Sequence, residues 1–248
     1  MVTKAAEAIS PENALRNVQE LLVNRLRGKP VRIYEAGGGS ISVIPLSSLD
    51  HPTVTAVDID ETQVRNNRYA DVKILGDIQT HAFPPNSFDL VVCYNVIEHL
   101  SSVDQAIKQF YRALAPGGLL FIGAPNPESL FGLVTKYTPH WFHVWVYRVI
   151  LRYKNAGRPG QGPFRTIYHP LVSPKALSEF CSQLGFEVIY LNQYVSSTYT
   201  RVKETSPIIG AMLNATVSLT NVLTFGRRNL AYGDYHVVLE KRVASANL

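Results

Sequence analysis

Four residues near the start of the chain have the types and spacing of a cofactor site. Glu35, Gly37 and Gly39 lie in the stretch YEAGGGSIS, directly after an apolar segment. Glycines at the end of a strand let the backbone approach a ligand closely. Asp58 ends the next apolar segment, where a carboxylate can accept hydrogen bonds from both hydroxyls of a ribose. These residues predict a site for an adenosine-containing cofactor.

The spacing within this loop distinguishes between such cofactors. A dinucleotide fingerprint G-x-G-x-x-G that began at Gly37 would place its third glycine at position 42, which is Ser42. Glu35 stands two places before the first glycine, where its charge would repel a pyrophosphate. A carboxylate there suits a methionine moiety, which carries an ammonium and a sulfonium. The loop therefore favours S-adenosylmethionine over a nicotinamide dinucleotide.

The elements that must position this loop alternate between apolar strands and helices. This alternation predicts an α/β fold with a doubly wound, mostly parallel seven-stranded sheet covered on both faces. The expected strands are Val31–Ala36, Val54–Asp60, Val72–Leu75, Phe88–Tyr94, Gly118–Ala124, Phe186–Tyr194 and Tyr235–Arg242. The expected helices are Pro11–Arg27, Val103–Ala115 and Pro174–Leu184, with Pro116-Gly117-Gly118 ending the second.

We expect residues 1–248 to form one domain with two insertions. Residues 125–172, rich in Pro, His and aromatic residues, are expected to be a helical and loop cover over the substrate site. Residues 196–232 are expected to be a helical insertion between strands six and seven. Within it, Thr205–Gly226 carries no charge and has Asn214, Ser218 and Asn221 at helical spacing, which indicates an amphipathic helix and not a spanning one.

Four stretches carry a family resemblance: YEAGGGS, AVDID, GDIQTHAFPPNSFDLVVCYNVIEHL and RALAPGGLLFIGAPN. They cover about the first half of the chain. In order and spacing the chain resembles the class I S-adenosylmethionine-dependent methyltransferases, especially the small-molecule enzymes similar to those of ubiquinone biosynthesis. The resemblance implies a Rossmann-like methyltransferase fold, S-adenosyl-L-methionine as cofactor, and S-adenosyl-L-homocysteine as product.

The resemblance also implies roles for individual residues. Gly37 and Gly39 would line the methionine part, Asp58 would hold the ribose, and Asp77 would meet the adenine amino group. The backbone of Ile78 would assist at the adenine, and Tyr94 and Asn95 would flank the methionine end. The expected cofactor-binding residues are Glu35, Gly37, Gly39, Asp58, Ile59, Asp77, Ile78 and Asn95. One departure is Ile41, which replaces the usual third glycine and is expected to crowd the floor of the pocket.

Methyl transfer to a hydroxyl needs a base, and three histidines are candidates: His143, His140 and His99. His143 and Tyr147 would share a helix face, with aromatic neighbours enclosing the acceptor. The alternative is a cover helix whose histidines only pack. For His99, in VIEHL, the preferred interpretation is that Glu98 caps a helix and His99 hydrogen-bonds locally. Because Asn95 replaces an acidic residue there, no metal is predicted.

Four residues are expected to bind the substrate. Trp141 and Tyr147 lie in the aromatic insertion, and Arg165 and His169 lie in the loop GRPGQGPFRTIYHP. This loop could be a mobile lid, or a plain surface connection. The sequence lacks the Pro-Cys of cytosine C5-methyltransferases and the Asn/Asp-Pro-Pro-aromatic motif of adenine N-methyltransferases.

Composition limits the partners. Residues 131–248 hold 13 basic and 5 acidic residues, whereas residues 1–130 hold 11 basic and 14 acidic ones. A basic half suits an anionic group on the acceptor, an anionic membrane surface or nucleic acid, or it is simply solvated. The chain shows no RNA-binding motif, which argues against nucleic acid. The two cysteines and the absence of an apolar leader predict a cytoplasmic location.

The leading hypothesis is therefore methylation of a small, partly apolar molecule, with oxygen preferred as the methylated atom. One alternative is an RNA methyltransferase, for which pI ≈ 9.2 speaks. The other is a catalytically inactive cofactor-binding or interaction protein, for which Ile41 would be the clue. The sequence leaves the oligomeric state open.

Overall fold

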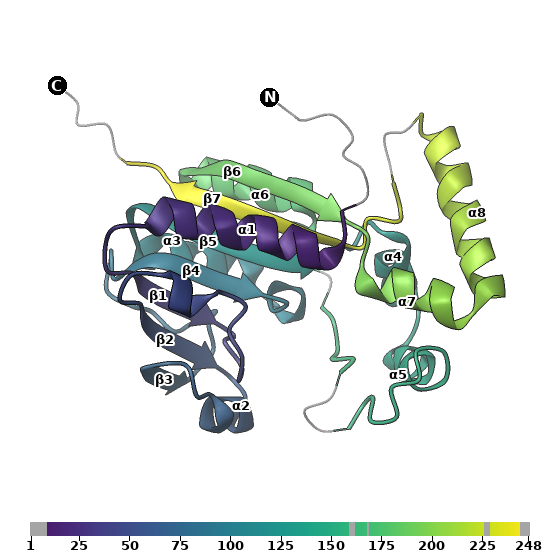
Figure 1. The fold of residues 1–248 in the computed structure, drawn as a ribbon, viewed down its shortest axis with the longest axis horizontal. Helices are drawn as coiled ribbons and strands as arrows, with labels where there is room; N and C mark the ends of the chain where they lie inside the picture. Colours follow the sequence, from purple (N-terminus) through teal and green to yellow (C-terminus); the bar gives the residue numbers. More distant parts are fainter. Residues whose placement is uncertain (1–8, 159–161, 168, 226–228, 244–248) are drawn as a thin grey trace.

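The structure, a computed structural model, describes residues 9–158, 162–167, 169–225 and 229–243. Its centre is a seven-stranded sheet of order β3-β2-β1-β4-β5-β7-β6 (Figure 1). Adjacent strands run parallel except β7, which is antiparallel to both β5 and β6. The strands are β1 (Arg32–Ala36), β2 (Thr53–Asp58), β3 (Val72–Leu75), β4 (Phe88–Tyr94), β5 (Leu114–Pro125), β6 (Phe186–Tyr194) and β7 (Asp234–Lys241). The predicted α/β, mostly parallel sheet is confirmed.

Helices cover both faces of the sheet: α1 (Pro11–Leu26), α2 (Glu61–Asn66), α3 (Val103–Ala113) and α6 (Pro174–Leu184). The side chains of Val18 and Leu22 on α1 are fully buried against one face. On the other face, Ile107 of α3 and Leu177 of α6 belong to a second buried cluster. Both faces are apolar because a parallel sheet must be shielded from water on each side.

The predicted helix starts are confirmed by their caps. The Ser10 hydroxyl accepts a hydrogen bond from the Asn13 amide at 3.3 Å, and Pro11 occupies the first turn of α1. Ser173 caps α6 in the same way, and Gly185 ends that helix with a φ of 109°.

The end of α3 differs from its prediction. The helix stops at Ala113 and β5 begins at Leu114, so Pro116-Gly117-Gly118 lies inside the strand. Pairing of β5 with β4 shifts register between Phe88 and Leu90, and this irregularity accommodates the extra residues. The helix therefore ends before the glycines that were expected to end it.

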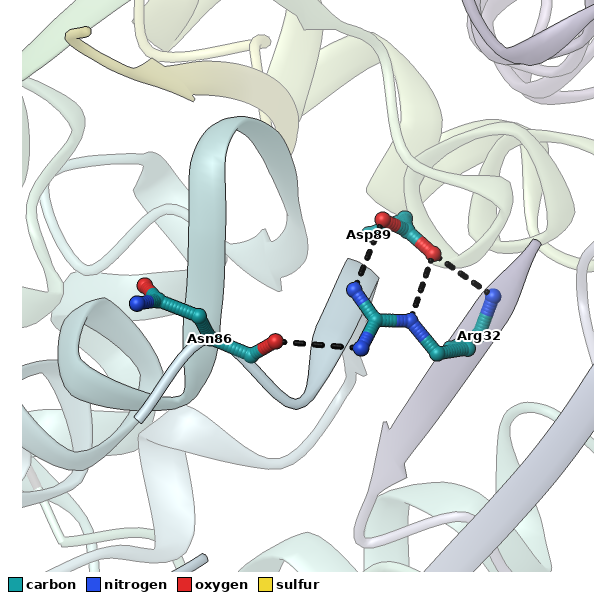
Figure 2. A network of polar contacts seen from close by, with 3 residues as sticks. All are labelled: Arg32, Asn86 and Asp89. Atoms are coloured by element: carbon teal, nitrogen blue, oxygen red, sulfur yellow. Dashed lines mark hydrogen bonds and ion pairs between the residues drawn. The ribbon is translucent and has the colours of Figure 1, made fainter. Parts of the chain in front are cut away.

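A polar network joins the amino ends of β1 and β4 (Figure 2). The Arg32 guanidinium donates to both carboxylate oxygens of Asp89 at 3.0 and 3.1 Å, and to the Asn86 carbonyl at 3.1 Å. Burial opposes ionisation of Asp89, but its hydrogen bonds from Arg32 are stronger and lower its pKa below the usual value. The network fixes two central strands at the edge opposite to the cofactor loop.

The remaining helices gather at one end of the molecule, beyond the β5–β7 part of the sheet (Figure 1). They are α4 (Leu130–Tyr137), α5 (His140–Val149), α7 (Ser197–Thr205) and α8 (Pro207–Leu223), and we call them the cover. Helix α8 confirms that the uncharged segment is helical, and α7 lies in the same insertion, 196–232, which was expected to be helical. Among the described residues, no helix combines the length and the apolar character needed to cross a bilayer.

Candidate active site

The glycine loop after β1 is held by backbone contacts to β2. The Gly37 amide donates to the Val57 carbonyl at 2.8 Å, and the Gly39 amide donates to the Asp58 carboxylate at 2.9 Å. Gly37 has a φ of 72°, and a Cβ placed on it would lie 2.5 Å from a methyl of Val96. Only glycine fits there, since both the backbone conformation and the space exclude a side chain.

Asp58 ends β2 beside this loop. Its carboxylate accepts from the amide of Gly39 and, at 2.9 Å, from the amide of Asp60, which orients both oxygens. The adjacent Ile59 is 74% exposed, although it is a large apolar residue. An oriented carboxylate next to an open apolar side chain fits a ribose followed by an adenine ring.

Glu35 lies behind the loop and is only 4% exposed. Its carboxylate accepts a short hydrogen bond from the Ser42 hydroxyl. Burial raises the pKa of Glu35 to about 7, although the Ser42 hydrogen bond acts in the opposite direction. The ammonium group at the methionine end of the cofactor, bound nearby, would favour the ionised form of Glu35.

The remaining predicted cofactor residues come from the ends of β3 and β4. The Gly76 amide donates to the Asp58 carbonyl at 2.9 Å, which brings Asp77 next to the end of β2. The Asp77 carboxylate accepts from the backbone and the side chain of Gln79, while Ile78 is buried. Asn95 is exposed after β4, with a φ of 55°. The predicted set therefore lines one edge of the sheet, where the carboxyl ends of parallel strands meet.

The expectation for Ile41 was wrong. Its side chain is 81% exposed and does not form the floor of a pocket. Its neighbour Ser42 points inward to Glu35 instead. The replacement of the usual glycine is accommodated because this part of the loop faces solvent.

The histidines of the cover have their partners within the cover. His143 is half-buried, and its Nε2 lies 2.8 Å from the Thr138 hydroxyl. Burial, and then the neighbouring His140, lower the pKa of His143. The rings of His140 and His143 are 6.1 Å apart, and His140 is exposed. Among the described contacts, none joins either histidine to the glycine loop.

Glu98 and His99 lie in a short 3₁₀ helix, η2 (Ile97–His99). The prediction that Glu98 caps a helix was wrong, since α3 begins later, at Val103 after Ser102. Glu98 is 5% exposed, and its Oε2 atom has no hydrogen-bond partner among the described residues. His99 has one distant and one local contact: its Nδ1 lies 2.9 Å from the carbonyl oxygen of Arg165, and its Nε2 lies 3.7 Å from Oε1 of Glu98. The 162–167 segment therefore packs on η2.

The predicted substrate residues do not form one wall. Trp141 is 69% exposed, and Arg165 is also exposed. The His169 Nδ1 accepts from the Leu171 amide at 3.2 Å and caps the 3₁₀ helix η3 (Pro170–Val172), which is a structural task. Tyr147 alone turns inward, where it hydrogen-bonds with Thr198 of α7 and burial raises its pKa.

The structure brings together a polar cluster that the sequence analysis missed. The Tyr194 hydroxyl lies 2.7 Å from Nε2 of His236, and both are buried. Tyr94, at the end of β4, hydrogen-bonds with Tyr194, and its ring centroid lies 5.7 Å from that of His236. Asp234 and Glu98 complete the group, which we call the tyrosine–carboxyl cluster.

The two carboxyl groups of this cluster titrate near neutrality. Burial raises the pKa of Glu98 to about 8, with a further contribution from the charge of Asp234. Burial also raises the pKa of Asp234 to about 7. Burial first, and then Asp234, raise the pKa of Tyr94. The members come from β4, η2, β6 and β7, so no spacing in the sequence could have revealed them.

Comparisons with known proteins identify the domain around this edge. Residues 35–122 match the family model described as "Methyltransferase domain". Residues 35–122 therefore form a methyltransferase domain, and S-adenosylmethionine-dependent methyltransferases are among the proteins similar to this chain. The predicted family and cofactor are thereby confirmed, and the glycine loop, Asp58 and the open Ile59 fit that cofactor.

The relatives of this methyltransferase domain align over part of their length. A probable S-adenosylmethionine-dependent methyltransferase of Mycolicibacterium smegmatis is 34% identical over 112 residues, which are 44% of this chain and 43% of that protein. The chain thus spans less than half of that relative. A ubiquinone biosynthesis O-methyltransferase of Neisseria meningitidis is 23% identical over 181 residues, which cover 66% of each chain.

Solved structures show the same fold. A Haemonchus contortus phosphoethanolamine N-methyltransferase in complex with S-adenosyl-L-methionine superposes with a TM-score of 0.57 at 16% identity, covering 92% of this chain and 53% of that one. The [4+2]-cyclase SpnF superposes with a TM-score of 0.57 at 16% identity, covering 95% and 85%. These likenesses establish the fold of the methyltransferase domain and not its reaction.

A cavity of about 1420 Å³ opens between the cover and the start of α1. Tyr147, Leu151 and Thr198 line it from the cover, and Ser10 and Glu12 line it from α1. None of the predicted cofactor residues lines this cavity. Within the described ranges, no group of three or more His, Cys, Asp or Glu side chains is arranged to hold a metal ion.

Proposed function

We propose that the chain transfers the methyl group of S-adenosylmethionine to an oxygen of a small, partly apolar acceptor. The observation that carries the proposal is the tyrosine–carboxyl cluster: its Tyr94 ends β4 next to Asn95 of the cofactor edge, and it combines aromatic side chains with the carboxyls of Glu98 and Asp234, whose pKa values burial raises to about 8 and about 7. The cofactor supplies the activated methyl group. Residues 125–172 and 196–232 of the single domain 1–248 would enclose the acceptor.

The chain's own residues would hold the cofactor by its two ends. Asp58 would accept hydrogen bonds from the ribose, and Ile59 would pack on the adenine, near Asp77 and the Ile78 backbone. Glu35 would attract the methionine ammonium behind Gly37 and Gly39. Asn95 would limit the methionine end on the β4 side.

Two sets of groups could accept the proton of an acceptor hydroxyl. Asp234 and Glu98 have pKa values of about 7 and 8, so each is partly ionised at neutral pH, as a general base requires. His143, His140 and His99 are the alternatives, and the lowered pKa of His143 keeps its ring neutral, although it also makes the ring a weaker base. We favour Asp234, because its charge also raises the pKa of Tyr147, the inward-facing aromatic residue of the cover.

The character of the acceptor follows from its surroundings and from one relative. Tyr94, Tyr147 and Tyr194 offer aromatic surface with hydroxyl groups at the rim, which suits a ring or chain that bears oxygen. Oxygen as the methylated atom is further supported by the Neisseria meningitidis relative, whose name is that of an O-methyltransferase. Trp141, Arg165 and His169 would contact the acceptor only if the cover moved inward.

The cofactor proposal is tested by titration calorimetry with S-adenosylmethionine. We expect micromolar binding that weakens at least about tenfold in Asp58→Ala, because a hydrogen bond to a charged group contributes roughly 1.5–3 kcal/mol. Asp60→Ala is the matched control, since Asp60 caps α2 through the amides of Thr62 and Gln63 and faces away from the ribose. Equal affinity in Asp58→Ala and the wild type would remove Asp58 from the site.

The base is assigned with three variants assayed on one acceptor. If Asp234 is the base, Asp234→Asn lowers kcat at least about a hundredfold at neutral pH while cofactor affinity is kept. Glu98→Gln and His143→Ala then lower it much less. A large loss in His143→Ala alone would transfer the assignment to the cover helix.

The alternative to methyl transfer is a protein that binds the cofactor without catalysis. The same calorimetry, followed by product analysis, distinguishes methyl transfer from cofactor binding alone. Cofactor binding without conversion to S-adenosyl-L-homocysteine, over a panel of phenolic and carboxylic acceptors, would favour this reading or an interaction protein. Binding of RNA that falls steeply with salt would favour an RNA methyltransferase.

A further inference from the structure

Helix α8 is unusually exposed for its composition. It has 17 residues and no charged side chain, and Gly210 is its one buried residue. A helix that is apolar on most of its surface is normally buried in a core or in a membrane. Figure 1 shows α8 standing at the outer end of the cover, beside α7. Part of its apolar surface therefore lacks a partner among the described residues.

The exposed part forms a regular stripe. Ile208, Met212, Leu219 and Val222 recur at helical spacing and are 78%, 66%, 60% and 72% exposed. The half-buried residues Ile209, Leu213 and Val217 form a second stripe turned about a quarter of a circle toward the body. The first stripe thus points away from the molecule. Phe225, just beyond the helix, continues it and is 91% exposed.

The other outer helices carry a second apolar surface rich in aromatic residues. Tyr137, Trp141, Trp145 and Val149 follow each other at intervals of four and are 76%, 69%, 47% and 57% exposed. The two tryptophans are the whole tryptophan content of the chain. Tryptophan and tyrosine favour the interface between water and lipid, since their rings are apolar with one polar tip.

Charge on the cover is almost entirely positive. Residues 129–172 and 195–225 contain eight basic residues and a single acidic one, Glu204. Lys136, Arg148, Lys154 and Lys203 are among the basic residues and are exposed. Such cations are attracted to the surface of an anionic bilayer. An uncharged apolar stripe flanked by aromatic residues and cations is the composition of a helix that lies in a membrane interface.

We propose that the cover docks on an anionic lipid bilayer through the outer stripe of α8 and the exposed aromatic residues of α4 and α5. A second copy of the chain would bring like charges together, because both copies carry the same cations. A nucleic acid would leave the apolar stripe in water. If the proposed function holds, docking brings the cavity that Tyr147 lines close to the bilayer. An apolar acceptor could then pass from the bilayer into this cavity.

Flotation with vesicles tests the proposal. The full chain should float with vesicles of phosphatidylcholine and phosphatidylglycerol, and at least tenfold less with phosphatidylcholine alone or in high salt. The double variant Met212→Glu/Leu219→Glu should lose flotation by at least tenfold. Ser218→Glu is the matched control, because it adds a charge to the polar side of the same helix, where Ser218 is exposed. It should float like the wild type.

Intrinsic fluorescence gives a second readout that needs no variant. Because Trp141 and Trp145 are the only tryptophans and both lie on α5, their emission should shift to shorter wavelength when anionic vesicles are added. Circular dichroism of the double variant should match that of the wild type, since both replaced side chains are exposed.

Three results would overturn the proposal. The first is absence of flotation of the wild type with anionic vesicles. The second is equal flotation of the double variant and the wild type. The third is a dimer in light scattering that the double variant abolishes, without vesicle binding, which would assign the stripe to a second copy. S-adenosylmethionine binding, measured without lipid, fails or succeeds independently and so separates this proposal from the proposed function.

Discussion

The loop after β1 and the helices after β5 position their side chains by different means. At the loop, backbone amides donate to the Val57 carbonyl and the Asp58 carboxylate, and Gly37 leaves no room for any other residue. In the cover, α5 has no buried residue, and α4 and α8 have one each. The cofactor edge is thus fixed by backbone geometry, whereas the cover is held by few buried contacts. The cover is therefore the region that can adapt to an acceptor or to a surface.

The largest effect on this comparison is expected from Gly37→Ala. Its Cβ would lie 2.5 Å from Val96 at a φ of 72°, so we expect a loss of about 2–4 kcal/mol in unfolding free energy together with loss of cofactor binding. Chemical denaturation measures the unfolding free energy, and calorimetry measures cofactor binding. Gly39→Ala is the control: a Cβ there meets only Gln63, at 3.6 Å, and its destabilisation should be less than half as large. Equal effects would contradict the steric account.

The next effect is expected at the junction between the two regions. The buried Asn126 side chain donates to Gln193 Oε1 at 3.2 Å and to the Tyr232 carbonyl at 3.1 Å, and accepts from the Glu128 amide at 3.0 Å. Asn126→Ala leaves these groups unpaired and should cost about 2–3 kcal/mol. Limited proteolysis should then cut the cover before the sheet. Simultaneous cleavage of both regions would show that they unfold as one unit.

A pH dependence of stability should arise in the tyrosine–carboxyl cluster, and also at Glu35 of the cofactor edge, whose pKa burial raises to about 7. Glu98 and Asp234 have folded pKa values of about 8 and 7, above the unfolded values of about 4. The folded protein therefore binds more protons between these limits, and its stability falls as pH rises from about 4 to about 8. Thermal melting at several pH values should show this fall. It should flatten in Asp234→Asn, whereas Asp60→Asn should keep the slope of the wild type.

The smallest effect is expected at the opposite edge. Asp89→Asn weakens the paired hydrogen bonds from Arg32 and should cost about 1 kcal/mol, a modest value because half of the Arg32 side chain is exposed. Cofactor affinity should not change. A loss of affinity would mean that the two edges of the sheet are coupled.

Sequence patterns predicted the sheet and the cofactor edge because both rest on local rules. Strand β4 has a continuous apolar run from Leu90 to Cys93, and the glycine loop needs its glycines at fixed positions. The bounds of α7 were not predicted, because STYTRVKET lacks an apolar run. The contact of Tyr194 with His236 joins residues that are distant in the chain and meet only in the folded sheet. The error over Ile41 arose because a family pattern does not state which way a loop side chain points.

The position of β7 also constrains the order in which the chain can assemble. This strand pairs with β5 on one side and with β6 on the other, yet it follows both in the sequence. Until residues 234–241 have left the ribosome, β6 has no place in the sheet and the edge of β5 is open to other strands. Until then the nascent protein has an unprotected sheet edge, and association with a chaperone would matter most at that stage.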